Sequence, residues 1–181
     1  MSVNAPNNQI NWEAPEFELI SVDGKYYNLK QLMGNKGIVI AFICNHCPYV
    51  VKIINRLVYE ASELKKIGVS MATIMSNNTE SYPDDSYDNM KLFSKKHDFT
   101  FPYLYDSTQK VAKLYQAVCT PDIYGFNQNK VLKYRCRIDS GVMTNEKNIK
   151  RELYNAMKLI TETNEGPEKQ FNSFGCSIKW K

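Results

Sequence analysis

The stretch Gly37-Ile-Val-Ile-Ala-Phe-Ile-Cys-Asn-His-Cys-Pro48 contains an abrupt change of pattern. Residues 37–43 are a continuous apolar, β-branched run, which is typical of a central strand buried on both faces. From Pro48 onward, apolar residues recur at helical spacing as far as Leu64, and proline is well tolerated in the first turn of a helix. The sequence therefore predicts that Cys44 and Cys47 lie where a buried strand meets the N-terminus of a helix.

Two cysteines separated by two residues at such a junction suit thiol–disulfide exchange. The reaction needs a thiolate near neutral pH and a second thiol close enough to resolve the mixed disulfide. The free N–H groups and the positive dipole end of a helix N-terminus favour a thiolate. We therefore predict that Cys44 is the exposed attacking thiol and that Cys47 is the resolving thiol. Asn45, His46 and Pro48 are predicted to tune the couple, with His46 supplying positive charge beside the thiolate.

The other cysteines and histidine do not complete a metal site. A structural zinc site takes four ligands, usually from a second C-x2-C or an H-x3-5-H, whereas His97, Cys119 and Cys136 are scattered single residues. A c-type haem needs a histidine directly after the second cysteine, where Pro48 stands. The five cysteines are odd in number and irregularly spaced, which argues against a disulfide scaffold. We expect a dithiol site without a metal or a cofactor.

Bulk composition predicts one globular domain and excludes several kinds of partner. The 181 residues are 43% hydrophobic, which is enough for a sizeable core, and the net charge is +4. Lysines are scattered rather than grouped into a basic stripe, so we expect no nucleic-acid partner. No apolar run approaches the ~18 residues of a membrane helix, and residues 1–11 lack the pattern of a signal peptide. We expect a cytoplasmic protein, or a periplasmic one if a signal peptide has been removed.

The rest of the chain predicts an α/β fold. Residues 17–22 and 25–29 are predicted strands joined at the hairpin signal Asp23-Gly24. Asp84, Asp85 and Ser86 are candidate N-caps for a helix that ends near residue 97. Further predicted segments are an irregular lead over 1–13, strands 69–75 and 101–105, a short helix capped by Ser107, a hairpin of 123–126 and 131–138, and a helix from about 146 to 163. This order predicts a central mixed sheet with parallel β–α–β units, flanked by helices, and an antiparallel hairpin at its edge.

Together these residues resemble the thioredoxin-like superfamily, and within it the AhpC/TSA (redoxin) branch with a CxxC active site. The resemblance rests on four stretches: Ala14 to Leu19 with the Asp23-Gly24 turn, Phe42 to Val50, Thr120-Pro121, and Tyr134 to Asp139. It implies a thioredoxin fold with an N-terminal β-hairpin extension over residues 14–163. Residues 164–181 would then be a tail that packs on this domain.

The resemblance also implies a substrate-docking role for Thr120 and Pro121. Pro121 would be cis and would face the CxxC, and Thr120 would offer its backbone groups to an extended substrate segment. Two features depart from the pattern of thioredoxins. Proline follows the second cysteine instead of preceding it, and the strand over 38–43 contains no buried acid to assist the resolving thiol. Proton transfer would therefore rely on water or on His46.

We predict a thiol–disulfide oxidoreductase that acts on disulfide-containing protein substrates in cell redox homeostasis, and that a dithiol reductant or oxidant recycles. The direction of electron flow and the oligomeric state stay open. One alternative is a thiol peroxidase with antioxidant activity, but neither cysteine lies in the Pro-x3-Thr/Ser-x2-Cys pattern that orients a peroxide. A second alternative is a non-catalytic interaction domain on the same fold.

Two cysteines outside the CxxC have open roles. Cys119 directly precedes Thr120 and is a candidate third redox thiol, although a small buried hydrophobe is the simpler interpretation. Cys176 lies near the end of the aromatic tail. It is either a resolving thiol carried by the tail or a residue that only packs on the domain.

Overall fold

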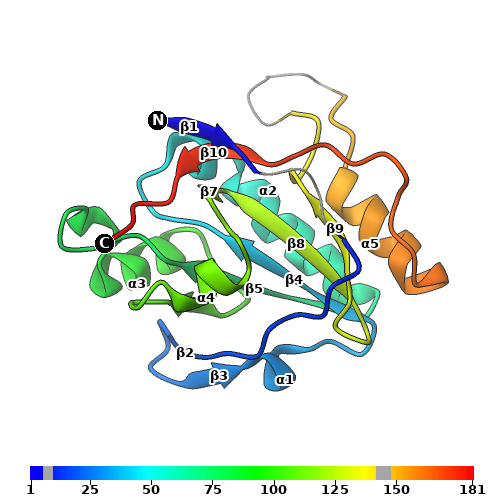
Figure 1. Ribbon diagram of the computed structural model, residues 1–181, viewed down its shortest axis with the longest axis horizontal. Coiled ribbons are helices and arrows are strands. Elements are labelled where there is room, and N and C mark those ends of the chain that lie inside the picture. Colours follow the sequence, from blue (N-terminus) through cyan, green and yellow to red (C-terminus); the bar gives the residue numbers. More distant parts are fainter. Residues whose placement is uncertain (6–9, 142–147) are drawn as a thin grey trace.

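Strand β4 (Gly37–Phe42) and helix α2 (Pro48–Lys66) form on either side of the CxxC, where the sequence predicts them. The computed structural model describes residues 1–5, 10–141 and 148–181 (Figure 1). The other strands are β1 (Ser2–Asn4), β2 (Glu18–Ser21), β3 (Tyr26–Asn28), β5 (Val69–Met75), β6 (Tyr103–Tyr105), β7 (Cys119–Thr120), β8 (Asp122–Asn127), β9 (Leu132–Cys136) and β10 (Phe174–Ser177). The other helices are α1 (Leu29–Leu32), α3 (Tyr87–Lys96), α4 (Lys110–Leu114) and α5 (Glu152–Thr163), with a short 3₁₀ turn, η1, at Pro83–Asp85.

Strand β4 lies in the middle of a mixed sheet. It pairs antiparallel with β8, from Gly37 opposite Asn127 to Phe42 opposite Asp122, and β8 pairs antiparallel with β9. On its other side β4 runs beside β5 (Figure 1), and the N–H of Ile43 donates to the carbonyl of Ile74 at 3.0 Å. Strand β5 pairs in parallel with β6, and the β2–β3 hairpin joins through β6. The predicted mixed α/β sheet is therefore confirmed.

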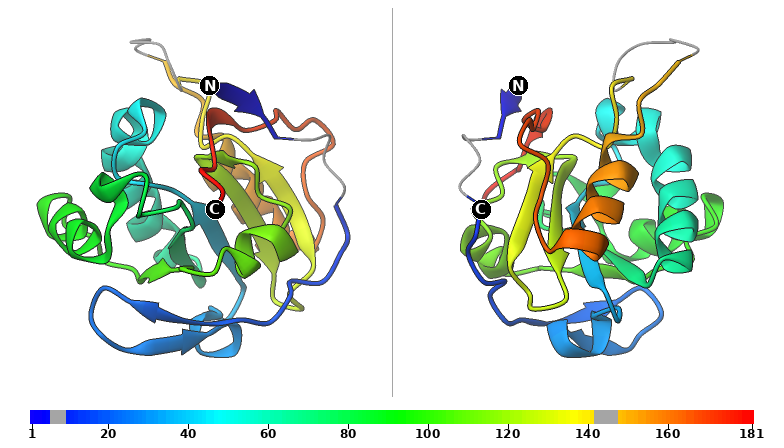
Figure 2. Two further views of the ribbon diagram at one scale, coloured as in Figure 1. Left: turned by 60° about the vertical axis from the view of Figure 1, so that its left-hand side comes forward. Right: turned by 90° about the vertical axis from the view of Figure 1, so that its right-hand side faces the viewer.

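The two faces of β4 are buried against different layers of helices. Val39, Ala41 and Ile43 belong to one core cluster, which α2, α3 and α5 cover. Ile38, Ile40 and Phe42 belong to a second cluster, closed by α1, α4 and the N-terminal segment. Figure 2 shows the sheet between these layers. Since successive side chains of a strand point to opposite faces, a wholly apolar strand is what a sheet covered on both sides requires.

Several predicted elements have different boundaries in the structure. Helix α4 begins after Gln109, which has a left-handed backbone with φ of 61°, so the predicted cap at Ser107 is wrong. The carboxylate of Asp106 accepts the N–H of Ala112 instead and so anchors the first turn. Helix α5 begins at Glu152 and not near residue 146, a position outside the described residues. The N–H of Leu153 donates to the carbonyl of Ile138, which ties the start of α5 to the segment after β9.

The two ends of the chain form a small sheet that the sequence did not predict. Residues 2–4, expected in an irregular lead, are strand β1, and residues 174–177 of the tail are strand β10. Strand β10 lies between β1 and β7 and pairs antiparallel with both (Figures 1 and 2). These strands are too short to carry a period of their own, and their partners are far away in sequence, so residue patterns could not reveal them.

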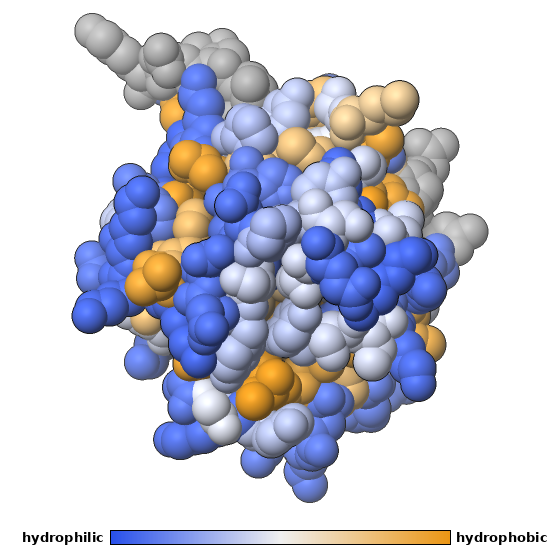
Figure 3. All heavy atoms as spheres, turned by 90° about the vertical axis from the view of Figure 1, so that its left-hand side faces the viewer, coloured by the Kyte–Doolittle hydropathy of each residue, from blue (hydrophilic) through white to orange (hydrophobic). Residues whose placement is uncertain are grey.

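One face of the molecule is mainly polar. Figure 3 shows hydrophilic residues over most of the face that lies on the left in Figure 1, with apolar residues in small separate patches. Among the described residues, no helix has the length and apolar character needed to span a membrane.

A buried ion pair supports the strand that follows Thr120-Pro121. Nη2 of Arg135 on β9 lies 3.2 Å from Oδ2 of Asp122 on β8, and it also donates to the carbonyl of Gln116 at 2.7 Å. The Asp122 carboxylate also accepts the hydroxyl of Tyr124 at 2.8 Å. Both charged side chains are almost wholly buried, so each depends on the other.

We expect Arg135→Met to lower the free energy of unfolding by about 3–5 kcal/mol, because it leaves the Asp122 carboxylate buried without its counter-charge. Urea denaturation measures the loss. Lys91→Met is the control, because Lys91 forms an exposed pair with Asp88, and it should cost at most about 1 kcal/mol. Equal effects of the two substitutions would contradict this account.

Candidate redox site

Cys44 and Cys47 lie at the junction of β4 and α2, as predicted. Cys47 is the N-cap residue of α2 and Pro48 occupies its first turn, while Cys44 follows the end of β4 by two residues. Both cysteines are free thiols, and both are fully buried. The prediction that Cys44 is exposed is therefore wrong, because neighbouring segments cover the strand–helix junction that was expected to be open.

Thr120 contacts both sulfur atoms. The Sγ of Cys44 lies 3.3 Å from the hydroxyl oxygen of Thr120, and the Sγ of Cys47 lies 3.2 Å from its carbonyl oxygen. The Thr120–Pro121 peptide bond is cis, and strand β7 brings it against the start of α2. The pairing of CxxC and cis-proline that the resemblance implies is thus present.

The two thiols share one proton unequally. A hydrogen bond from Cys44 is the main cause that lowers the pKa of Cys47, to about 5, and hydrogen bonds from Cys176 and from the N–H of Val50 add to it. The same contact, together with burial and the charge of Asp85, raises the pKa of Cys44 well above the ordinary value. The contact of Cys47 with the Thr120 carbonyl suits a protonated thiol and opposes this distribution. We favour the thiolate on Cys47 because Cys47 is the N-cap of α2 and the N–H of Val50, in the first turn of that helix, acts on its sulfur.

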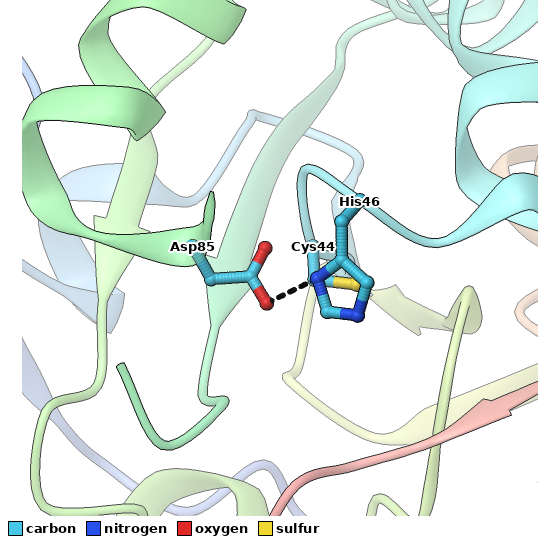
Figure 4. Close-up of side chains that lie close together, drawn as sticks. All are labelled: Cys44, His46 and Asp85. Atoms are coloured by element: carbon cyan, nitrogen blue, oxygen red, sulfur yellow. Dashed lines mark ion pairs between the residues drawn. The ribbon is translucent and has the colours of Figure 1, made fainter. Parts of the chain in front are cut away.

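A buried acid lies beside the CxxC, although the strand contains none. Oδ2 of Asp85, in η1, is 2.8 Å from Nδ1 of His46, and the two side chains point toward one another next to Cys44 (Figure 4). The pair meets the distance of an ion pair without the geometry of a hydrogen bond. The carboxylate also accepts the N–H of Asn45 and the amide of Asn77, both at 2.8 Å. Asp85 therefore holds the CxxC loop in two ways, through the backbone N–H of Asn45 and through the imidazole of His46.

Asn45 fastens the same loop to two further elements. Its side-chain oxygen accepts the hydroxyl of Tyr103 on β6 at 2.9 Å, and its amide donates to the carbonyl of Asp84 at 2.9 Å. The sequence marks Asp85 only as a candidate helix cap, whereas Ser86 is the actual N-cap of α3. The role of Asp85 beside His46 could not be read from the sequence, since 38 intervening residues place the acid there only through the fold.

Cys44, His46 and Asp85 also have the composition of a metal-binding group. One ligand atom from each lies within 4.8 Å of the others. Three protein ligands are one fewer than a closed structural zinc site uses. The Asp85 oxygens are already engaged by Asn45, Asn77 and His46. The arrangement fits a hydrogen-bonded network around a thiol better than a metal centre.

The remaining cysteines differ in their relation to the CxxC. Cys119 is buried and donates to the carbonyl of Pro121 at 3.8 Å, and burial raises its pKa. Cys136 donates to the side chain of Gln170. Cys176 on β10 interacts directly with Cys47, and burial and this contact raise its pKa to about 11.

Comparison with known proteins identifies the class of this fold and site. The AhpC/TSA family profile matches residues 10–135, and the chain belongs to the AhpC/TSA family. Among proteins with curated descriptions, none matches the chain.

Solved structures extend the likeness to the whole chain. An uncharacterised conserved protein from Geobacillus kaustophilus is 40% identical with a TM-score of 0.95, covering 100% of this chain and 97% of its own. A hypothetical protein from Sinorhizobium meliloti is 28% identical with a TM-score of 0.93, covering 98% of each chain. The thioredoxin domain of a thiol-disulfide oxidoreductase from Bacteroides vulgatus is 14% identical with a TM-score of 0.66, covering 86% of this chain and 99% of its own. The last likeness concerns the fold alone, and it confirms the predicted thioredoxin fold.

We expect the reduced protein to develop thiolate absorbance in the ultraviolet with a midpoint near pH 5, the value to which the pKa of Cys47 is lowered. In Cys44→Ala the midpoint should rise toward the ordinary thiol value of ~8.5, because the principal hydrogen-bond donor is removed. Cys136→Ala removes a thiol that bonds to Gln170 instead and should leave the midpoint unchanged. An unaltered midpoint in Cys44→Ala would show that the two sulfurs do not share a proton.

Proposed function

We propose that this protein is a thiol–disulfide oxidoreductase that exchanges disulfides with protein substrates through the Cys44–Cys47 pair. The observation that carries the proposal is the pair of thiols at a helix N-terminus, sharing a proton and contacting the residue before a cis-proline. Such a pair offers a thiolate for attack and a neighbouring thiol for resolution. Membership of the AhpC/TSA family supports a thiol-based redox activity.

The position of the negative charge indicates which of the two cysteines attacks the substrate and which resolves the mixed disulfide. From the sequence alone, Cys44 is the predicted attacking thiol and Cys47 the resolving one. The lowered pKa of Cys47 and its place at the N-cap of α2 support the reverse order, since the thiolate is the nucleophile. Cys44, whose pKa is raised, then holds the proton that the exchange must move. His46 and Asp85 lie beside Cys44 and are suited to position that proton.

A stabilised thiolate also bears on the direction of electron flow. Interactions that favour the thiolate stabilise the reduced protein and so make the disulfide a stronger oxidant. Hydrogen bonds from two other cysteines and from Val50 act in this sense on Cys47. We therefore propose that the protein donates its disulfide to dithiol substrates, and that an oxidant recycles it.

The backbone edge of β7, next to the thiols, supports the proposal that the substrate is a protein. Strand β7, which carries Thr120, already pairs with the extended segment β10 of the same chain. An external polypeptide would add along this edge in place of β10, as in recognition by strand addition.

We expect the oxidised protein to introduce disulfides into reduced ribonuclease, and Cys44→Ser and Cys47→Ser each to lower the rate by more than ~100-fold, because either change removes half of the exchanging pair. Mass spectrometry follows disulfide formation, and Cys136→Ala is the matched control. A wild-type rate no faster than buffer would favour a non-catalytic interaction domain. Rapid consumption of hydrogen peroxide with a thiol reductant would favour a peroxidase.

We expect the reduction potential of the pair to lie between ~−180 and ~−120 mV, above the ~−270 mV of thioredoxin. Asp85→Asn should leave the potential at pH 7 unchanged, because Cys44 stays protonated there, and should lower the pH at which the potential stops falling with pH, because the charge of Asp85 opposes a thiolate on Cys44. Equilibration with glutathione buffers over a range of pH measures both values. Asp84→Asn is the control, since this neighbouring carboxylate is exposed, and an equal shift in both variants would reject a specific effect of Asp85.

A further inference from the structure

Strand β10 occupies the backbone edge beside the cis-proline. Cys176 lies opposite Thr120, and Ser177 lies opposite Cys119, in an antiparallel pair. Gly175 makes the close approach possible, because a Cβ atom there would lie 2.0 Å from the carbonyl oxygen of Thr120. The tail therefore holds the position that an extended substrate strand would take next to the thiols.

Alternate residues of β10 face the CxxC. The ring of Phe174 packs edge-on against Tyr49, in the first turn of α2, with centroids 5.1 Å apart. Cys176, two residues further on, packs against the core cluster that contains Cys44 and Cys47. Its thiol and its backbone N–H both act on the sulfur of Cys47. The strand thus presents a thiol to one sulfur of the pair.

Strand β10 is held along its outer edge and directly after its last residue, so the thiol of Cys176 has a fixed place. Strand β1 pairs with its outer edge, where Ser2 lies opposite Cys176. After the strand, the N–H of Ile178 donates to the carbonyl of Val118, and the N–H of Lys179 donates to the side chain of Asn77. Packing against Tyr49 accounts for the aromatic residue Phe174, but it does not require a cysteine opposite Thr120.

We propose that Cys176 is a third redox thiol, which attacks the Cys44–Cys47 disulfide at the sulfur of Cys47. A Cys176–Cys47 bond forms, the Cys44–Cys47 bond breaks, and the electron pair leaves on Cys44, which takes up a proton. No external oxidant is needed, because one disulfide replaces another within the chain. Strand β10 is then a substrate built into the protein, and the inference rests on the proposed exchange activity.

The charges around Cys176 suit this step. In the reduced protein, burial raises the pKa of Cys176, and the contact with Cys47 raises it further. When Cys47 is in a disulfide it carries no negative charge, so that part of the effect is removed. Lys179 lowers the pKa of Cys176 in either state. Oxidation of the CxxC therefore makes the Cys176 thiolate easier to form.

The test maps disulfides after the reduced protein is oxidised with glutathione disulfide, quenched with acid and alkylated. Cys44→Ser should form a Cys47–Cys176 disulfide, detected as a cross-linked peptide by mass spectrometry. Cys44→Ser/Cys176→Ser should lose this peptide and keep Cys47 as a glutathione adduct. Cys44→Ser/Cys119→Ser is the matched control and should retain the Cys47–Cys176 peptide. Gly175→Ala, which keeps every thiol, should yield less of the cross-link with Cys44→Ser, because it forces β10 away from Thr120.

The outcomes separate this inference from the proposed function. If wild-type protein forms the Cys44–Cys47 disulfide and exchanges it with ribonuclease, while Cys44→Ser gives only the glutathione adduct, the third thiol is rejected and the exchange activity stands. A Cys47–Cys119 peptide in place of Cys47–Cys176 would also reject it. If wild-type protein neither forms the Cys44–Cys47 disulfide nor exchanges disulfides, the proposed function fails. A circular dichroism spectrum equal to that of the wild type verifies that each variant is folded.

Discussion

The contacts of Thr120 with the two sulfur atoms are the interaction on which the site depends. They join the β4–α2 junction, which carries the CxxC, to strand β7, which belongs to the small sheet with β10 and β1. The buried pair of Asp122 and Arg135 fixes the strands directly after Pro121. A shift of β7 would therefore change the surroundings of both thiols at once, and with them the proton that the thiols share.

The charge of the site follows from which groups reach each sulfur. Cys47 is contacted by hydrogen-bond donors, while Cys44 lies beside a carboxylate. This asymmetry separates two otherwise identical side chains, as neighbouring titratable groups do in many active sites. His46 lies between Cys44 and Asp85. The loop that positions His46 therefore also positions the charged groups around the Cys44 thiol.

The chain covers its own redox pair with its last strand. Both thiols are buried, and Cys176 of this strand packs against the core cluster that contains them. The strand also places a third cysteine against Cys47, with the backbone of β10 paired to Thr120. A protein substrate can therefore reach the edge of β7 beside the two thiols only when β10 moves away from it.

The sequence by itself determined the apolar strand over 37–43, the helix from Pro48, the CxxC between them and the hairpin around Asp23-Gly24, because periodicity and turn residues are local signals. The family resemblance added the cis bond before Pro121. Only the tertiary structure decided that Cys44 is buried, that Asp85 pairs with His46, and that Cys176 lies opposite Thr120. The last two features join residues 39 and 56 positions apart, and no local pattern encodes which distant segments meet.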